Sequence, residues 1–398
     1  MTLGNAIARR IIESSDYRIT FAEYMSLALY HPQHGYYATS PRRIGAAGDF
    51  FTSPHLGADF GQLLAEQFVQ MWQILQPPHP FTLVEMGAGQ GLLAADILRY
   101  LAQKYPEFSS GLQYIIIERA AALVEEQKRQ LNCLGDMGAE VRWCQFEDIS
   151  PDSITGCFFS NELVDALPVH QITVAEEQLK EVYVSLAAGS RDAPEDGYPQ
   201  FIEVTADLST PRLAEYFNLV GIDLRPPQYP TGYRSDVNLA ALDWIADVAR
   251  RLRQGYVLTI DYGYPSDRYY SPARSQGTLQ CYYRHAHHSN PYIYVGQQDI
   301  TAHVDFTALQ KQGDQCGLEF VGLTKQGLFL MALGLGNRLA ALSQSNSTDP
   351  SEIQAKLRDR EALHTLINPI GLGNFGVLVQ SKGVEQSQPL TGLMGELN

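Results

Sequence analysis

Short apolar runs alternate with amphipathic stretches through the middle of the chain. The apolar runs are FTLVEMG from residue 81, LQYIIIE from residue 112, VRWCQ from residue 141 and GCFFSN from residue 156. Apolar positions recur every three or four residues at 91–104, between the first and second runs, and at 121–134, between the second and third. This spacing is typical of helices. Buried strands that alternate with helices predict an α/β fold with a doubly wound, mostly parallel sheet.

This alternation is interrupted twice. After the fourth strand, three strand-like runs separated by polar turns predict an antiparallel insertion, within residues 170–235. The helical stretch VNLAALDWIADVARRL and the apolar run GYVLTIDYG then restore the rhythm before a second, irregular insertion at residues 264–304. We expect the whole α/β domain to span residues 76–383 and the polar tail, residues 384–398, to be disordered.

The first 75 residues predict N-terminal helices joined by a long loop. Thr20 and Glu23 have the spacing of a capping box, so a helix begins there. A second helical pattern covers residues 56–72, and the segment before it, AAGDFFTSPH, is rich in glycine and polar residues. Long loops of this kind often bind ligands. We expect Gly48, Asp49 and Thr52 to fold over a ligand as a lid, with a cap on the following helix as the alternative.

Charge and cysteine content narrow the function classes. The 398-residue chain has a formal net charge of −15, and no run of Lys and Arg exceeds two residues, which disfavours a nucleic-acid partner. Its five cysteines are scattered without a C-x-x-C pair, which favours a reducing compartment over a disulfide or zinc framework. No apolar run approaches the about 18 residues of a membrane span, and the N-terminus does not resemble a leader peptide. We expect a cytoplasmic location.

Three glycines follow the first strand in the turn EMGAGQG. They are Gly87, Gly89 and Gly91, and they let a backbone approach a ligand closely at a helix N-terminus. A dinucleotide fingerprint would need a glycine at position 92, which is Leu92, and a P-loop would need Gly-Lys-Ser/Thr. The spacing, with Glu85 two residues before the first glycine, resembles motif I of class I S-adenosylmethionine (SAM) methyltransferases. The alternative is a tight turn that only packs helix on sheet.

Two further acids fall at the carboxyl ends of successive predicted strands. Glu118 ends YIIIE, where a carboxylate can accept both ribose hydroxyls of a nucleoside. Asp148 follows the third strand, where the class I methyltransferase fold reads the adenine amino group. Because SAM carries a cationic sulfonium and an ammonium but no phosphate, acidic strand ends suit it better than a basic loop. We therefore expect SAM as the cofactor and no metal.

Several segments together resemble one family. They are FAEYMSLALYHPQHGYY, GDFFTSPHLGADFGQLLAE, VEMGAGQGLLAADIL, SNELVDALPVH, LTIDYGYP, GTLQCYYRH and GQQDITAHVDFT. They are similar to the MidA-like family of SAM-dependent methyltransferases, and the likeness covers about residues 10–335. The resemblance implies a class I, Rossmann-like methyltransferase fold. It also implies protein arginine methylation, since mitochondrial members assist complex I assembly by symmetrically dimethylating an arginine of a core subunit. A protein subunit of this type is the expected partner.

An arginine methyltransferase must hold a permanently protonated guanidinium, which paired carboxylates bind through bidentate hydrogen bonds. Asn161, Glu162 and Asp165 follow the fourth strand, and we expect Glu162 to be the first clamp residue and Asp165 the second. Better-known arginine methyltransferases carry a second glutamate nine residues after the first, but position 171 is Gln171 here. The alternative is that these acids complement a helix dipole.

Other polar residues leave alternatives open. Asp261 in IDYGYP can hold a substrate group or satisfy turn amides, and the second is the favoured interpretation. The histidines of the second insertion lack a helical ligand spacing, so a metal site is disfavoured. The same cofactor half also permits a small-molecule methyltransferase, or a SAM-binding assembly factor without essential catalysis.

Overall fold

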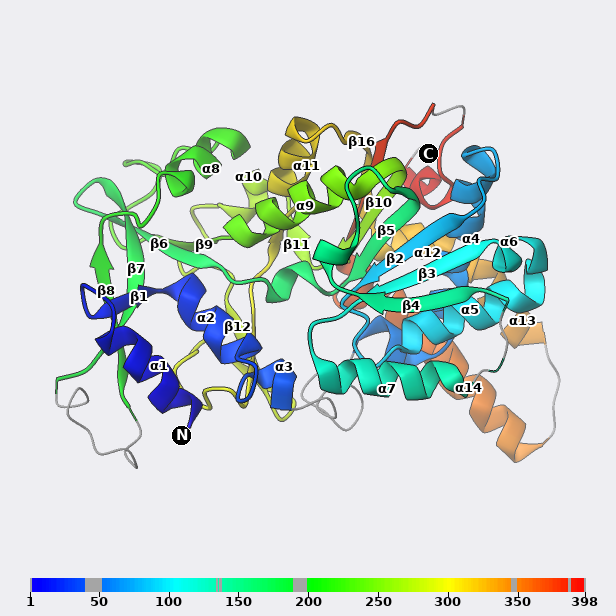
Figure 1. The fold of residues 1–398 in the computed structure, drawn as a ribbon, viewed down its shortest axis with the longest axis horizontal. Helices are drawn as coiled ribbons and strands as arrows, with labels where there is room; N and C mark the ends of the chain where they lie inside the picture. The colour runs from blue at the N-terminus through cyan, green and yellow to red at the C-terminus, as the bar shows by residue number, and fades with distance from the viewer. Residues whose placement is uncertain are drawn as a thin grey trace. The chain divides into compact units, whose positions relative to one another are not determined.

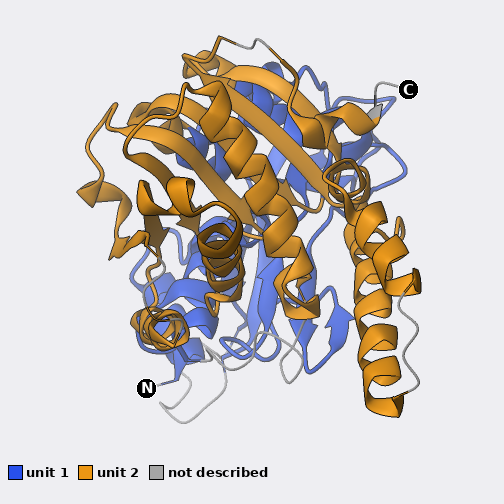
Figure 2. Cartoon of the chain, turned by 90° about the vertical axis from the view of Figure 1, so that its right-hand side faces the viewer, with its two compact units in different colours: residues 1–50, 164–245, 263–312 blue, residues 51–163, 246–262, 313–398 orange. Residues whose placement is uncertain are grey.

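The computed structural model describes residues 2–39, 52–133, 135, 138–188, 199–344, 349–385 and 388–396. The chain divides into two compact units, which Figure 2 colours separately. Unit 1 comprises Met1–Phe50, Val164–Ile245 and Gly263–Gln312, and unit 2 comprises Phe51–Leu163, Ala246–Tyr262 and Gly313–Asn398. The chain passes from one unit to the other within helices α9 (Leu239–Arg251) and α11 (Phe306–Gln315).

Unit 2 is built on a mostly parallel sheet, as the strand and helix alternation predicted (Figure 1). The strand order is β16-β17-β10-β5-β2-β3-β4. Strands β4, β3, β2, β5 and β10 pair in parallel, and β17 pairs antiparallel with β10 and β16. The bounds are β2 Phe81–Met86, β3 Leu112–Ile117, β4 Glu140–Cys144, β5 Ile154–Asn161, β10 Leu252–Asp261, β16 Glu319–Lys325 and β17 Gly376–Lys382.

Helices cover this sheet through an extensive apolar core. Phe68 of α4, Ile97 of α5 and Phe159 of β5 belong to one core cluster, and each is at most 1% exposed. The alternation of side chains along β5 and β10 sends Phe159 and Ile260 to this face, and their sequence neighbours to the other. The helices of unit 2 are α4 Asp59–Ile74, α5 Leu92–Lys104, α6 Pro106–Ser110, α7 Ala121–Asn132, α12 Gln326–Ala332, α13 Leu335–Gln344 and α14 Pro350–Leu366, with 3-10 turns η2 Ser53–Leu56, η3 Phe146–Asp148 and η5 Leu372–Asn374.

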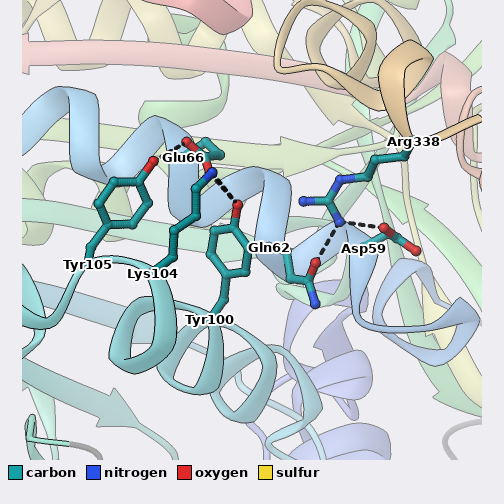
Figure 3. Close-up of polar contacts among 7 residues, drawn as sticks. All are labelled: Asp59, Gln62, Glu66, Tyr100, Lys104, Tyr105 and Arg338. Atoms are coloured by element: carbon teal, nitrogen blue, oxygen red, sulfur yellow. Dashed lines mark hydrogen bonds and ion pairs between the residues drawn. The ribbon is translucent and has the colours of Figure 1, made fainter. Parts of the chain in front are cut away.

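A half-buried glutamate ties α4 to α5 (Figure 3). The Glu66 carboxylate accepts hydrogen bonds from the hydroxyls of Tyr100 and Tyr105 and from Lys104 Nζ, the last at 2.6 Å. Earlier on α4, Asp59 and Gln62 accept hydrogen bonds from Arg338 of α13. Burial opposes ionisation of Glu66, but the three donors outweigh it and lower its pKa below 4.5.

Replacing Glu66 with glutamine is expected to lower the free energy of unfolding at neutral pH by about 1–3 kcal/mol, because charge-assisted hydrogen bonds weaken. Since the pKa of Glu66 is lowered in the folded protein, its contribution is present above the unfolded pKa and is lost as pH falls through the folded pKa. Urea unfolding of both proteins at neutral and acidic pH measures this. The exposed Glu107→Gln is the control, and equal stability of wild type and Glu66→Gln at neutral pH would contradict the assignment.

The C-terminal tail corrects one expectation. Residues 384–398 were expected to be disordered, but η6 (Thr391–Glu396) packs on unit 2 and Leu390 is only 2% exposed. The side chain of the fully buried Gln67 accepts a hydrogen bond from the Gly392 N–H at 2.9 Å. Gln70, on the same helix, accepts one from the Thr391 N–H at 2.8 Å. The polar composition of the tail hid this, because the partners are side chains of α4, distant in sequence.

Unit 1 combines the N-terminal helices with both insertions. Its larger sheet has the order β1-β7-β6-β9, with β8 paired to β7, and the pairings are antiparallel, as expected for residues 170–205. The strands are β1 Arg18–Thr20, β6 His170–Ala175, β7 Gln178–Leu186, β8 Phe201–Ala206, β9 Arg234–Val237, β11 Gly263–Tyr264, β12 Gln280–Tyr283, β13 Ala286–His288, β14 Asp299–Thr301 and β15 Val304–Asp305. The helices are α1 Leu3–Ile12, α2 Phe21–Tyr30, α3 Tyr36–Thr39, α8 Arg212–Val220 and α10 Ser266–Tyr269, with the 3-10 turn η4 Val164–Ala166.

The helix expected at Thr20 begins there. Thr20 is the N-cap of α2, and its Oγ1 accepts a hydrogen bond from the Glu23 N–H at 3.1 Å. The division of the chain differs from the expected boundary at residue 75, because α1–α3 belong to unit 1 whereas α4 belongs to unit 2. Among the described residues, no helix is both long and apolar enough to cross a membrane.

Candidate functional site

The candidate site lies at the edge of the unit 2 sheet where the parallel strands end. Because β2, β3, β4, β5 and β10 run in the same direction, the residues that follow them gather at one edge. The glycine turn follows β2, Glu118 follows β3, Asp148 comes after β4, and Glu162 follows β5. The edge therefore brings together most of the residues that the sequence indicated.

The glycine turn requires glycine at each of its three positions. Gly87, Gly89 and Gly91 have φ values of 73°, 53° and 79°, which L-residues with a side chain rarely adopt. A Cβ on Gly87 would lie 2.8 Å from Leu163 Cδ1, and one on Gly91 would lie 3.3 Å from Gln127 Cα. Within the described part of the chain, a Cβ on Gly89 would meet no atom within 4 Å, so it would project into open space. Gly91 is the N-cap of α5, which has no side-chain cap.

The acid before the turn is part of the sheet. Glu85 is 3% exposed, and its Oε2 accepts a hydrogen bond from the Tyr114 hydroxyl at 2.7 Å. Burial raises the pKa of Glu85 to about 7, the hydrogen bond from Tyr114 opposes this rise, and the nearby charge of Glu118 adds to it. Glu85 is thus a buried carboxyl group that changes its charge near neutral pH.

The raised pKa of Glu85 makes stability depend on pH. An acid with a raised pKa in the folded state favours the protonated form, so its stabilising contribution is complete below 4.5 and is lost as pH rises to about 7. The wild type should therefore lose up to about 3 kcal/mol relative to Glu85→Gln over this window. Urea unfolding of both ligand-free proteins at pH 5 and pH 8 measures the difference. A difference that is the same at both pH values would show that Glu85 does not titrate there.

A network around Gln127 holds the second acid. Glu118 Oε1 accepts a hydrogen bond from the Ala120 N–H at 2.9 Å, and Oε2 accepts one from Gln127 Nε2 at 3.3 Å. Gln127 Nε2 also donates to the Gly89 carbonyl oxygen at 2.9 Å, and its Oε1 accepts from Trp143 Nε1 at 3.0 Å. One fully buried amide therefore joins the glycine turn, the end of β3 and strand β4.

The sequence reasoning did not select Gln127, although a signal was present. Gln127 occupies the middle of the buried stripe of α7, between Leu123 and Leu131. A polar residue within an apolar helical stripe needs hydrogen-bond partners, because burying an unpaired amide is costly. Tyr114 and Trp143 were missed for a different reason, since their positions in apolar strands predict core packing.

Asp148 lies at the third strand end and is exposed. Its Oδ2 accepts a hydrogen bond from the Gln145 N–H at 2.9 Å, which closes a capping box on η3. The Gln145 side chain donates to the Glu118 carbonyl oxygen at 2.9 Å. The second and third acids are therefore linked through Gln145, and one carboxylate oxygen of Asp148 is used for the local turn.

The segment expected to act as a lid is only partly described. Gly48 and Asp49 lie outside the described residues. Thr52 is buried, and its Oγ1 is 2.7 Å from Nδ1 of His55, whose Nε2 is 3.3 Å from Gln90 Oε1 in the glycine turn. Burial lowers the pKa of His55. The described end of this segment is therefore linked to the turn through an imidazole.

The fourth strand end carries Asn161 and Glu162 and lies next to the glycine turn. Asn161 Nδ2 donates a hydrogen bond to Glu162 Oε1 at 3.1 Å, and the Glu162 N–H donates to the Ile260 carbonyl oxygen at 2.9 Å. The next residue, Leu163, is the side chain that lies against Gly87. Glu162 has a φ of 52°, which is uncommon for a residue with a side chain.

Asp165, the second expected clamp residue, belongs to unit 1. It is 5% exposed within η4, and its carbonyl oxygen accepts a hydrogen bond from the Ala302 N–H at 2.9 Å. Burial raises the pKa of Tyr37, and the charges of Asp299, Tyr30 and Asp165 add to this rise, which places Asp165 near Tyr37.

Among the described residues, no group of three or more His, Cys, Asp or Glu side chains could hold a metal ion.

Comparisons with known proteins find similar sequences and structures. A family model described as an S-adenosyl-L-methionine-dependent methyltransferase matches residues 63–324, more than half of the chain. The chain is 30% identical to the mitochondrial protein arginine methyltransferase NDUFAF7 of Mus musculus and 29% identical to that of Rattus norvegicus. Each of these alignments covers 89% of this chain and 79% of the relative.

Solved structures with the same fold include two from Burkholderia thailandensis. One is a crystal structure of a protein bound to S-adenosyl-homocysteine, with a TM-score of 0.84, 31% identity and coverage of 98% of this chain and 94% of that chain. The other is a native crystal structure with a TM-score of 0.81, the same identity and the same coverage. The first of them holds the demethylated product of SAM.

Proposed function

This chain belongs to the family of SAM-dependent methyltransferases, and we propose that it methylates an arginine side chain of a protein. The family membership establishes the reaction type and the cofactor. The arginine specificity rests on the relatives named as protein arginine methyltransferases and on the acidic strand end after β5. A subunit of respiratory complex I type is the substrate that we propose, as the resemblance to the MidA-like family implies.

The glycine turn and the acids beside it are proposed to hold SAM. The open space at Gly89 lets the backbone approach the ligand, and the uncapped first turn of α5 after Gly91 offers N–H groups. Gly87 completes this turn. In this proposal Glu118 accepts hydrogen bonds from the ribose hydroxyls, and Asp148 accepts one from the adenine amino group. These donors and acceptors fit a nucleoside without phosphate groups.

Other expected cofactor residues act less directly in this proposal. Glu85 is buried and hydrogen-bonded to Tyr114, so in this proposal it supports the glycine turn without contacting the cofactor. Thr52 orients His55 towards Gln90, which steadies the turn from the other side. Gly48 and Asp49 are proposed to cover the cofactor from the segment that precedes Thr52.

The observation that carries the arginine assignment is the fixed carboxylate of Glu162. Its strand end contacts the glycine turn through Leu163, and Asn161 holds one of its oxygens. An ionised carboxylate in this position suits a cation better than a neutral acceptor, because guanidinium donors match its geometry. The buried Asn161 Oδ1, which has no hydrogen-bond partner in the described part of the chain, can accept a further N–H from the substrate.

SAM supplies a methyl group that is already activated on a positively charged sulfonium. The protein therefore contributes mainly orientation and electrostatics. Glu162 accepts hydrogen bonds from the guanidinium and directs one nitrogen towards the methyl group. As that nitrogen gains the methyl group it loses a proton, which the Glu162 carboxylate can accept.

Radiolabelled SAM tests the proposal. The purified protein is incubated with methyl-labelled SAM and a lysate, and labelled proteins are digested and analysed by mass spectrometry. We expect label on methylarginine within a protein, and the labelled peptide identifies the substrate. Label confined to small molecules would instead show a small-molecule methyltransferase. Label on another protein residue would keep the reaction type and exclude arginine.

A further inference from the structure

The last residue of β10 is a buried aspartate beside Glu162. Asp261 is 0% exposed, and its Oδ1 accepts a hydrogen bond from the Tyr262 N–H at 2.9 Å. The parallel register pairs Ile260 with Asn161, so Asp261 follows at the position next to Glu162. Neighbouring strands lie about 4.8 Å apart, and the Glu162 N–H bond to Ile260 continues the ladder to this point. Two carboxylates thus end adjacent strands.

The face on which Asp261 lies carries two buried hydroxyls. Ile260 points to the apolar core, so Thr259 and Asp261 point to the opposite face of the sheet. Ser160 pairs with Thr259 across β5 and β10 and shares that face. Ser160 is 0% exposed and Thr259 1% exposed, yet in the part of the chain that the structure describes neither hydroxyl has a hydrogen-bond partner.

A buried hydroxyl without a protein partner is able to hydrogen-bond a ligand group or an ordered water. The hydroxyls of Ser160 and Thr259 lie on the same sheet face as Asp261. Thr259 is two residues before Asp261 on β10. On the other side of β10, the residue paired with Asp261 is Gly376 of β17, which has no side chain. Within the sheet, Asp261 therefore has hydroxyl-bearing residues near it on β5 and β10 and a glycine as its pair on β17.

We propose that Asp261 is the second carboxylate that holds the substrate guanidinium, together with Glu162. This inference rests on the proposed arginine methylation. A carboxylate has acceptor capacity for more than one donor, so Asp261 can bind the Tyr262 N–H and a guanidinium N–H together. A guanidinium offers five N–H donors in a planar fork, and acids on two adjacent strands can bind two of its edges. Asp261 then takes the role that the sequence assigned to Asp165.

The substitution Asp261→Asn removes the negative charge but keeps the size of the side chain. The amide oxygen of asparagine can still accept the Tyr262 N–H, so the turn and the thermal stability should be kept. Loss of a charge-assisted bond should raise KM for the arginine peptide identified in the labelling experiment by about tenfold to 100-fold. The dissociation constant for SAM should change less than twofold, because the proposed cofactor contacts follow β2, β3 and β4 or precede α4, and none of them lies on β10.

Two matched variants serve as controls. Asp305→Asn makes the same change at another buried carboxylate, which accepts the Thr307 N–H at 3.0 Å and belongs to unit 1, so its KM should equal that of the wild type. Asp165→Asn tests the residue that Asp261 replaces. A KM within twofold of the wild type for Asp261→Asn, or a rise in KM for Asp165→Asn alone, would overturn the inference.

The wild type in the same assay keeps the two proposals distinct. A wild type that methylates no arginine refutes the proposed function, whereas an active wild type with an unchanged KM in Asp261→Asn refutes only the role of Asp261. If Asp261→Asn does not fold, Asp261→Ser keeps an acceptor for the Tyr262 N–H in a smaller side chain and is assayed in its place. The same threshold applies to that variant.

Discussion

Replacing Glu162 with glutamine is expected to lower kcat/KM for arginine methylation by about 100-fold to 1000-fold, because a charge aimed at the reacting group is lost. Glutamine keeps an Oε1 that can accept the hydrogen bond from Asn161 Nδ2, and its backbone can keep the bond to Ile260. The geometry of the strand end should therefore survive while the charge disappears. Initial rates with the labelled arginine peptide, together with calorimetric SAM binding, measure both effects.

SAM affinity within twofold of the wild type is part of the expected result for Glu162→Gln, since it separates loss of catalysis from loss of folding. The exposed Glu147→Gln removes the same charge elsewhere in unit 2 and should retain full activity. A Glu162→Gln enzyme with more than a tenth of the wild-type kcat/KM would show that this carboxylate does not hold the guanidinium.

Gly89→Ala is expected to weaken SAM binding by at least about tenfold. The added Cβ would meet no atom of the described residues within 4 Å, and in the proposed SAM site it would project towards the ligand. The φ of 53° also costs an alanine about 1–2 kcal/mol in stability, independently of any ligand. Calorimetric titration with SAM and thermal unfolding of the ligand-free protein measure the two contributions separately.

Gly317→Ala is the matched control for this experiment. Gly317 also belongs to unit 2, has a φ of 83°, and a Cβ there would likewise meet nothing within 4 Å. Both variants should therefore lose similar stability, but only Gly89→Ala should lose SAM affinity. Equal SAM affinity in the two variants would mean that the turn serves packing alone, which is the alternative that the glycine spacing left open.

The pattern of apolar positions predicted the catalytic fold well because it reports on local geometry. Period-two and helical repeats identified the strands and helices of the sheet, and the glycine spacing identified a turn whose three φ values are positive. The acids Glu118 and Asp148 were found from their distance to strand ends, which is again a local property. For the same reason the antiparallel insertion after β5 was predicted correctly.

The site was predicted less completely, because its side chains are brought together by pairing between distant segments. Asp165 stands three residues after Glu162, and proximity in sequence suggested a shared role, which stays a prediction; the chain enters unit 1 at Val164. Asp261 lies 99 positions after Glu162 in the sequence. It nevertheless ends the strand beside Glu162, because β10 pairs with β5. No local pattern states which strands become neighbours.

The sequence by itself determined the reaction class of this protein, through the strand and helix alternation, the glycine turn and the acids at strand ends. Only the tertiary structure decided how Gln127 joins three strand ends, which acid lies beside Glu162, and that the polar tail packs on α4. The physical reason is the range of the interactions. Backbone conformation and burial periodicity are set by neighbouring residues, whereas hydrogen bonds and charge pairs in a site depend on which distant segments the folded chain places together.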